Sequence, residues 1–208
     1  MSAELTKVHG GSDNRTMSTP PILPIGPAKV EYSTPFVQVE ETPVRFPNGA
    51  EGSYARINPG THGGVAIPRS ITRGIARYGL VRQYRHPVAH ITLEFPRGGT
   101  DDGSEAETVR ELVEETGLSI PLGGGFHLGT LHADTGLLAT DISVWLIPVE
   151  DIGDSAFIEA ETGASHLWVT EGELFGLISR GELSCGITLG AFMMLKASAH
   201  AVAPGTVG

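Results

Sequence analysis

The sequence is poor in cysteine, with Cys185 alone among 208 residues. A single cysteine cannot form an intrachain disulfide, and such a chain suits a reducing compartment. Positive charge is also scarce, because 14 lysine and arginine residues face 24 aspartate and glutamate residues and leave a net charge of −10. Proteins that bind nucleic-acid backbones are usually basic, so this balance argues against a nucleic-acid partner. It does not exclude a small anionic substrate whose charge is screened by metal ions.

Long apolar runs are missing as well. The first 20 residues have no apolar core of the kind found in signal peptides, and the most apolar stretch, Gly186 to Leu195, is too short to span a bilayer. We therefore expect a soluble, cytoplasmic protein without a membrane partner.

The composition is that of a globular chain, with 40% hydrophobic and 18% charged residues. Its length predicts one main domain with a small appendage. Residues 1–25 are polar and rich in proline, glycine and serine, which predicts a disordered tail. Short alternating segments in residues 26–62, separated by an Asn-Gly turn, predict N-terminal strands. Residues 63–200 mix strands and helices, which is typical of an α+β or layered α/β/α domain. The predicted strands are 29–41, 53–58, 64–69, 76–84, 90–96 and 141–149, and the later helices are 170–178 and 183–199.

The helix predicted over residues 105–116 carries the strongest functional signal. Ser104 and Glu107 have the spacing of a capping box, and Gly117 follows where a helix commonly ends. On a helical projection four of the five glutamates of this segment share one arc, and Arg110 lies at its border. These four are Glu107, Glu111, Glu114 and Glu115. The arc contains no lysine. Clustered carboxylates are the ligands that Mg²⁺ prefers, although a solvated acidic face is the alternative.

The segment RELVEETGL, from Arg110 to Leu118, resembles the core of the Nudix box, Arg-Glu-apolar-x-Glu-Glu-x-Gly-apolar, and matches it at every position. The flanking segments GLVRQYRHPV and GELSCGITLGAF resemble the ADP-ribose pyrophosphatase-like branch of the Nudix hydrolases. The resemblance covers roughly residues 30 to 197. It implies a Nudix-type α/β/α sandwich with a mixed sheet and an N-terminal β extension.

The resemblance also implies an activity and the residues that support it. The branch hydrolyses the diphosphate bond of a nucleoside diphosphate linked to a second moiety, such as ADP-ribose or a nucleotide sugar, with Mg²⁺ or alternatively Mn²⁺. It releases a nucleoside monophosphate and a phosphorylated partner. By position, Glu111, Glu114 and Glu115 and the carbonyl of Gly99 would hold metal, and Arg110 would orient a glutamate.

Further roles carry over from the same branch. Glu161, or alternatively Glu159, would help deprotonate the attacking water, unless both belong to an acidic loop without a catalytic role. The residues that would contact substrate are Arg82, Arg85, Glu94, Arg97 and Gly136, with structural ion pairs as the alternative for Arg82 and Arg85. The N-terminal strands and the QYRHPV segment would form a homodimer.

Two departures from the usual pattern are visible. Only four residues separate Glu105 from Arg110, so the loop of the box is three residues short and its early acidic ligand is shifted, to Asp102, or lost. Thr135 also stands where the branch usually has a proline. The short loop favours a second hypothesis, a Nudix-fold module that senses a nucleotide without hydrolysing it efficiently. A housecleaning nucleoside triphosphatase is a third, against which the N-terminal strands argue.

Overall fold

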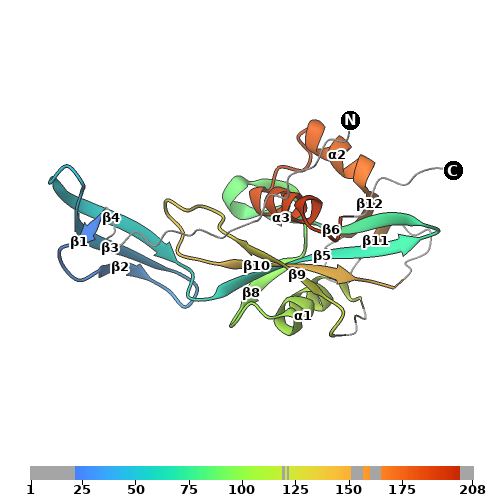
Figure 1. The fold of residues 1–208 in the computed structure, drawn as a ribbon, viewed down its shortest axis with the longest axis horizontal. Coiled ribbons are helices and arrows are strands. Elements are labelled where there is room, and N and C mark those ends of the chain that lie inside the picture. The colour runs from blue at the N-terminus through green and yellow to red at the C-terminus, as the bar shows by residue number, and fades with distance from the viewer. Residues whose placement is uncertain (1–21, 119, 121, 151–156, 160–164, 202–208) are drawn as a thin grey trace, which may run out of the picture.

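The computed structural model describes residues 22–118, 120, 122–150, 157–159 and 165–201, and it contains two β-sheets. The smaller sheet is antiparallel and projects from the main body as an arm (Figure 1). Its strands are β1 (Leu23–Pro24), β2 (Lys29–Ser33), β3 (Gln38–Arg45) and β4 (Glu51–Asn58). The predicted Asn-Gly turn joins β3 to β4, and Gly49 has the positive φ of 84° that this turn requires.

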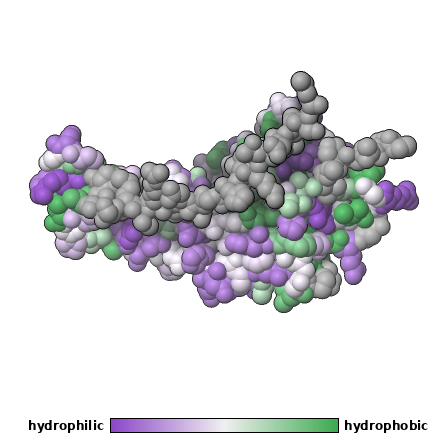
Figure 2. All heavy atoms as spheres, in the orientation of Figure 1, coloured by the Kyte–Doolittle hydropathy of each residue, from purple (hydrophilic) through white to green (hydrophobic). Residues whose placement is uncertain are grey.

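The arm has almost no interior of its own. Among its described residues only Val44 is buried. Figure 2 shows hydrophilic and hydrophobic side chains mixed over its visible face. Leu23 and Pro24, which the sequence placed in a disordered tail, pair with β3 instead. Residues 1–21 lie outside the described part of the chain.

The larger sheet is mixed and has the order β11-β12-β6-β5-β10-β9, with β7 added to β6 and β8 added to β5. Strand β10 runs parallel to β5, whereas the other pairs are antiparallel. The strands are β5 (His62–Thr72), β6 (Ile75–Arg85), β7 (His90–Glu94), β8 (Arg97–Thr100), β9 (Phe126–Leu131), β10 (Ile142–Pro148), β11 (Phe157–Glu159) and β12 (Ser165–Thr170).

Helices cover both faces of this sheet. Helix α1 (Glu105–Thr116) packs on one face, and α2 (Glu171–Ser179) and α3 (Gly186–Ala197) lie on the other, as Figure 1 shows. A short 3-10 helix, η1 (His86–Val88), connects β6 to β7. The predicted α/β/α sandwich with a mixed sheet and an N-terminal β extension is thus confirmed. No helix in the described residues is long and apolar enough to cross a membrane.

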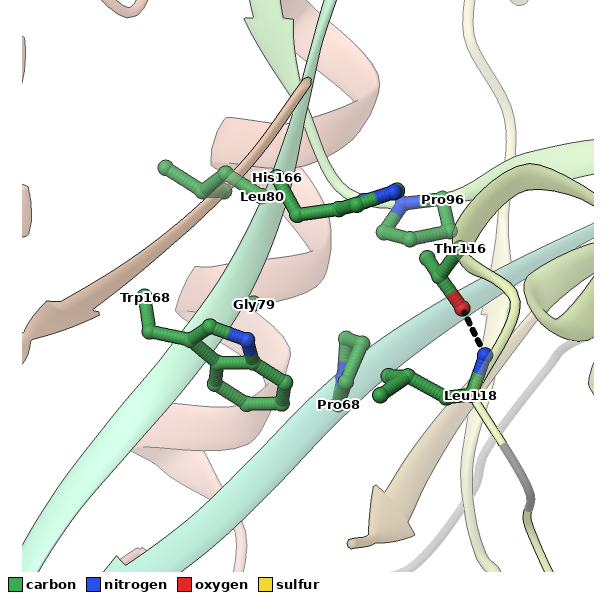
Figure 3. Close-up of a pocket in the computed structure, with 8 residues that line it drawn as sticks. All are labelled: Pro68, Gly79, Leu80, Pro96, Thr116, Leu118, His166 and Trp168. Carbon is green, nitrogen blue, oxygen red and sulfur yellow. Dashed lines mark hydrogen bonds between the residues drawn. The ribbon is translucent and has the colours of Figure 1, made fainter. Parts of the chain in front are cut away.

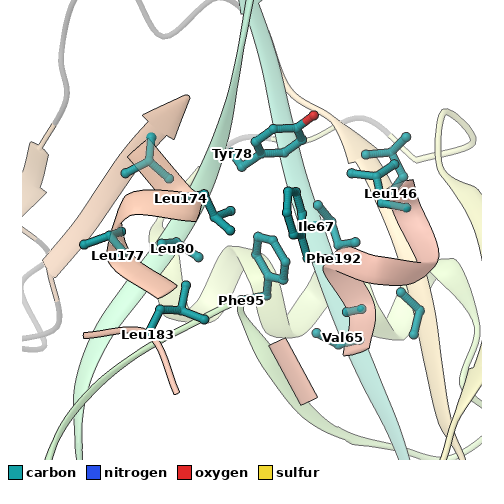
Figure 4. Close-up of a cluster of buried hydrophobic side chains, with 14 of the residues drawn as sticks. Val65, Ile67, Tyr78, Leu80, Phe95, Leu146, Leu174, Leu177, Leu183 and Phe192 are labelled. Carbon is teal, nitrogen blue, oxygen red and sulfur yellow. The ribbon is translucent and has the colours of Figure 1, made fainter. Parts of the chain in front are cut away.

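Strand β5 shows why the sandwich has two cores. Val65 and Ile67 point toward α3 and join the large cluster with Leu80, Phe95 and Phe192 (Figure 4). Ala66 points to the other side and packs with Val109, Leu112 and Ile147 beneath α1. Alternate side chains of a strand point to opposite faces, so a continuous apolar run is buried on both sides.

Several predicted boundaries were wrong. The strand predicted over residues 29–41 is two antiparallel strands, β2 and β3, and β3 continues to Arg45. The strand predicted over residues 90–96 ends at Glu94, and Arg97–Thr100 forms a separate strand, β8, because it pairs with residues 62–65 of β5. The last helix was predicted from Leu183 and begins at Gly186, because Leu183 is buried in the large core before the helix starts.

Candidate active site

Helix α1 begins and ends where the sequence predicts. The hydroxyl of Ser104 accepts a hydrogen bond from the Glu107 amide at 3.4 Å, and Gly117 closes the helix with a φ of 67°. The reciprocal half of the capping box is absent, however. The Glu107 carboxylate accepts from the amides of Asp101 and Asp102 at 2.5 and 3.3 Å, while the Ser104 amide donates to Asp102 at 2.8 Å. The short loop before α1 is therefore held by its own acidic side chains.

Arg110 is the centre of the acidic face. Its Nη2 lies 2.6 Å from Oε1 of Glu111, and its Nη1 donates to Oε1 of Glu114 at 3.0 Å. The same Nη2 also donates to the carbonyl of Gly99 at 3.5 Å. One guanidinium thus gathers three of the predicted metal ligands and offsets the repulsion between neighbouring carboxylates.

Gly98 brings β8 and α1 into close contact. A Cβ atom at this position would lie 1.8 Å from Oε2 of Glu111, so any side chain would displace that carboxylate. Glu111 is consequently packed against the backbone of β8, with only 18% of its side chain exposed.

Glu115 lies one turn further along α1 and accepts a hydrogen bond from the Arg97 amide at 3.3 Å. Burial, with a smaller contribution from the charge of Glu111, raises the pKa of Glu115 to about 7, although the Arg97 amide and the charge of Arg85 act in the opposite direction. A nearby cation favours the ionised form of a carboxyl group whose pKa has been raised by burial.

A second charged cluster surrounds Glu94, which is 2% exposed. Arg85 binds it through two nitrogens at 3.0 and 2.7 Å, Arg97 donates through Nε at 2.9 Å, and the Thr92 hydroxyl donates at 2.7 Å. Burial pushes the pKa of Glu94 upward, but the hydrogen bonds from Arg85 and Thr92 and the two arginine charges outweigh burial and lower the pKa to about 2. Glu94 is therefore a permanent anion that fixes both guanidinium groups.

The Glu94 cluster forms the wall of an open groove of about 430 Å³. Arg85 and Arg97 line one side, and Ser184 and Cys185, just before α3, line another. The Arg97 backbone links this groove to Glu115 on α1. The acidic face and the arginine-lined groove are thus neighbours along one edge of the sheet.

The remaining predicted site residues do not join this group. Arg82 is exposed and, three residues before Arg85 on β6, lies on the opposite face of the strand. Gly136 belongs to a segment that packs against the arm, where the Ile57 amide donates to Leu137 at 2.9 Å. Glu161 lies outside the described residues, and Glu159 ends β11, where its backbone pairs with Ser165 of β12.

Sequence reasoning missed the function of Glu105. Its Oε1 accepts hydrogen bonds from the amides of Gly123 and Gly125 at 3.0 and 2.7 Å, so it anchors the loop before β9. The glycine run was the available signal, because a Cβ at Gly125 would lie 2.8 Å from that oxygen. Glu105 and Asp102 therefore bind backbone amides.

The oxygen atoms near Arg110 suit a hard divalent cation. In the described part of the chain, no three histidine, cysteine, aspartate or glutamate side chains are already arranged around a common metal position. The carboxylates of Glu111 and Glu115 nevertheless lie against the backbone of β8, and Arg110 binds both Glu114 and the Gly99 carbonyl. Carboxylate and carbonyl oxygens are the donors that Mg²⁺ and Mn²⁺ prefer.

Comparisons with known proteins concern the fold and the resemblance seen in the sequence. No family model matches the chain. Over 91 aligned residues the chain is 34% identical to an ADP-sugar pyrophosphatase of Mus musculus. The aligned region covers 38% of this chain and 42% of the mouse protein. The match therefore spans less than half the length of this curated relative. A solved structure described as an ADP compounds hydrolase has a similar fold, with a TM-score of 0.66 and 18% identity, over 88% of this chain and 98% of that one. The intact box on α1, the sandwich fold and these similarities confirm the resemblance to Nudix hydrolases of the ADP-ribose pyrophosphatase-like branch.

Proposed function

We propose that the protein is a Nudix pyrophosphohydrolase that hydrolyses the diphosphate bond of a nucleoside diphosphate linked to a second moiety, of the ADP-ribose or nucleotide-sugar type. The products are a nucleoside monophosphate and a phosphorylated partner, and the reaction depends on Mg²⁺, or alternatively Mn²⁺. The observation that carries the proposal is the adjacency of two charged groups. The Arg110-centred carboxylates of α1 meet the arginine-lined groove at the backbone of Arg97.

The α1 carboxylates and the arginine-lined groove would bind different parts of a metal-diphosphate substrate. Glu111, Glu115 and the Gly99 carbonyl would hold the metal, with Glu114 as a further ligand or near neighbour. A bound divalent metal polarises phosphate oxygens and lowers the pKa of a coordinated water. Arg85 and Arg97 line the groove and keep N–H donors beyond those that Glu94 engages, which suits them to bind phosphate oxygens. Glu94 would hold both arginines in position.

We propose Glu161, over Glu159, as the residue that helps deprotonate the attacking water. The support is its place in the sequence between β11 and β12, beside Thr162 and Gly163. Glu161→Gln is expected to lower kcat by about 10²–10⁴-fold, the range for a lost general base, with little change in substrate affinity. Steady-state kinetics on both Gln variants decide the assignment, which would be reversed by a comparable loss in Glu159→Gln and none in Glu161→Gln.

The competing function is a nucleotide-sensing module with weak catalysis. One observation favours it, since the carboxylates of Asp102 and Glu105, the two candidates for the early ligand of the box, bind backbone amides. A panel of ADP-ribose and nucleotide sugars, each with and without Mg²⁺, separates the two functions when product release is followed by chromatography and affinity by calorimetry. Turnover of at least one compound supports the hydrolase. Micromolar binding without products, in protein with intact Glu115, supports the sensor.

We further propose that the protein is a homodimer that uses the arm. A sheet with one buried residue cannot offset the entropy of ordering its strands. The arm exposes large apolar side chains, namely Val30, Tyr32, Phe36 and Tyr54, and the β6–β7 hairpin adds Tyr84 and Ile91. Burying such surface against a second copy would supply the missing core.

Light scattering at micromolar concentration is expected to give twice the chain mass. The double variant Phe36→Ser and Tyr54→Ser should shift the protein toward monomer, while Phe175→Ser, an exposed aromatic on α2, should not. A monomeric wild-type protein would contradict the proposed assembly.

The acidic net charge and single cysteine are consistent with our proposal of a cytoplasmic enzyme that has no nucleic-acid or membrane partner.

A further inference from the structure

A small cavity of about 10 Å³ lies between the C-terminal end of α1 and the sheet (Figure 3). Pro96, Thr116 and Leu118 form one side, and His166 and Trp168, which point to the same face of β12, form the other. The remaining wall comes from β5 and β6. Such a volume admits one water molecule at most, so a group inside this cavity cannot be hydrated as it is in solution.

The two β12 side chains bring unpaired nitrogen atoms into this cavity. His166 and Trp168 are each 3% exposed. Both ring nitrogens of His166 and the indole nitrogen of Trp168 are buried without a hydrogen-bond partner in the described structure. Buried polar groups without partners destabilise a fold, and an apolar side chain would fill position 166 without that cost. Packing alone therefore does not explain the histidine.

The surroundings can accept a neutral imidazole but not a charged one. None of the cavity-lining residues on β5, β6, the β7–β8 link, α1 or β12 is an acid, an arginine or a lysine. The Thr116 hydroxyl is engaged with the Leu112 carbonyl at 2.5 Å and the Leu118 amide at 3.3 Å. Glu94, two strands away on the same sheet face, is already bound by two arginines, and Glu115 precedes Thr116 on α1.

We propose that His166 is a proton-sensitive support for the C-terminal end of α1. As a neutral ring it fills the space under Thr116 and Leu118, and as an imidazolium it breaks that contact. The inference stands on the cavity and does not depend on the proposed hydrolysis. Because Thr116 follows Glu115, release of this helix end would also disorder the carboxylate face of α1. Acid would therefore inactivate the site by releasing the helix that carries it.

The direction of the pH effect follows from burial. Burial alone lowers the pKa of His166 from its ordinary value. The unfolded chain therefore takes up a proton near pH 6.5, before the folded chain does. Stability from this residue is fully present above pH 6.5 and is lost as the pH falls below it.

Urea unfolding at pH 7.5 and pH 5.5 tests the proposal. The unfolding constant of the wild type, divided by that of His166→Leu, is expected to rise as the pH falls from 7.5 to 5.5. The rise can reach about tenfold, which is the upper limit for one proton over this interval. Other titrating groups are common to both proteins and cancel in the ratio. His132→Gln, which removes an exposed histidine paired with Asp141, should keep the wild-type response. Should His166→Leu not fold, His166→Gln, which also does not titrate, replaces it.

Trp168 provides a local readout of the same event. The chain has two tryptophans, so in a Trp145→Phe background the emission comes from Trp168 beside His166. Its intensity and emission maximum are expected to change between pH 7 and pH 5, before global unfolding, and to stay constant when His166→Leu is added. A constant unfolding ratio, or an emission change that persists without His166, would overturn the proposal.

Discussion

Replacing Glu115 by glutamine is expected to remove most of the hydrolytic activity while the protein stays folded. Glu115 and Glu111 lie one helical turn apart, roughly 6 Å along the axis at 1.5 Å per residue, so both can reach one metal cluster. Glutamine keeps the size of each side chain but removes one anionic oxygen from the proposed Mg²⁺ ligands. We expect Glu115→Gln and Glu111→Gln each to lower kcat by at least about 100-fold, or about 2.7 kcal/mol of barrier, on the best substrate at saturating Mg²⁺.

Asp102 and Glu105 provide matched controls on the same segment. Their carboxylates accept hydrogen bonds from the amides of Ser104 and of Gly123 and Gly125, which the oxygen of an asparagine or glutamine can also accept. Asp102→Asn and Glu105→Gln should therefore cost less than about tenfold, a barrier change below about 1.4 kcal/mol. Circular dichroism verifies that all four variants are folded. If Asp102→Asn were as damaging as Glu115→Gln, the short loop would still supply a metal ligand.

Glu94→Gln is expected to cause the largest loss of stability among single substitutions at the site. The amide nitrogen of glutamine would face guanidinium donors, and Arg85 and Arg97 would lose their shared counter-charge. Removing one partner of a buried ion pair costs about 3–5 kcal/mol. Because both arginines are about 30% exposed, we expect about 2–3 kcal/mol.

Urea unfolding monitored by circular dichroism measures this loss. Glu182→Gln, which breaks an exposed pair with Arg180, should leave stability unchanged. The folded pKa of Glu94, about 2, lies below its ordinary 4.5, so its contribution is present above pH 4.5 and disappears as the pH falls toward 2. The difference between wild type and Glu94→Gln should shrink in that window. An unchanged midpoint at pH 7 would show that the arginines do not depend on Glu94.

Local signals in the sequence predicted α1 well. Ser104, Gly117 and the glutamate arc depend on residues within one helix, where spacing determines which side chains meet. The RELVEETGL pattern then linked that face to a known chemistry. The order of alternating and helical segments left an α+β or a layered α/β/α domain open, and the resemblance to the Nudix hydrolases then implied the sandwich with its N-terminal extension.

Partners far apart in the chain could not be predicted. The segment Arg97–Thr100 became a strand because residues 62–65, some 35 positions earlier, lie beside it. Which of Arg82 and Arg85 faces the groove depends on the register of β6, and a single residue reverses the face. The partner of Glu107 also depended on a loop conformation that spacing alone does not determine.

Arg110 gives the acidic helix an internal counter-ion. Because its guanidinium already pairs with both Glu111 and Glu114, gathering the carboxylates does not require a metal, and the chain should reach its native state in a chelator. Metal binding would then be an exchange of partners, in which a divalent ion displaces an arginine from oxygens that are already in place. The cation would bind reversibly at the site and would add little to the stability of the fold.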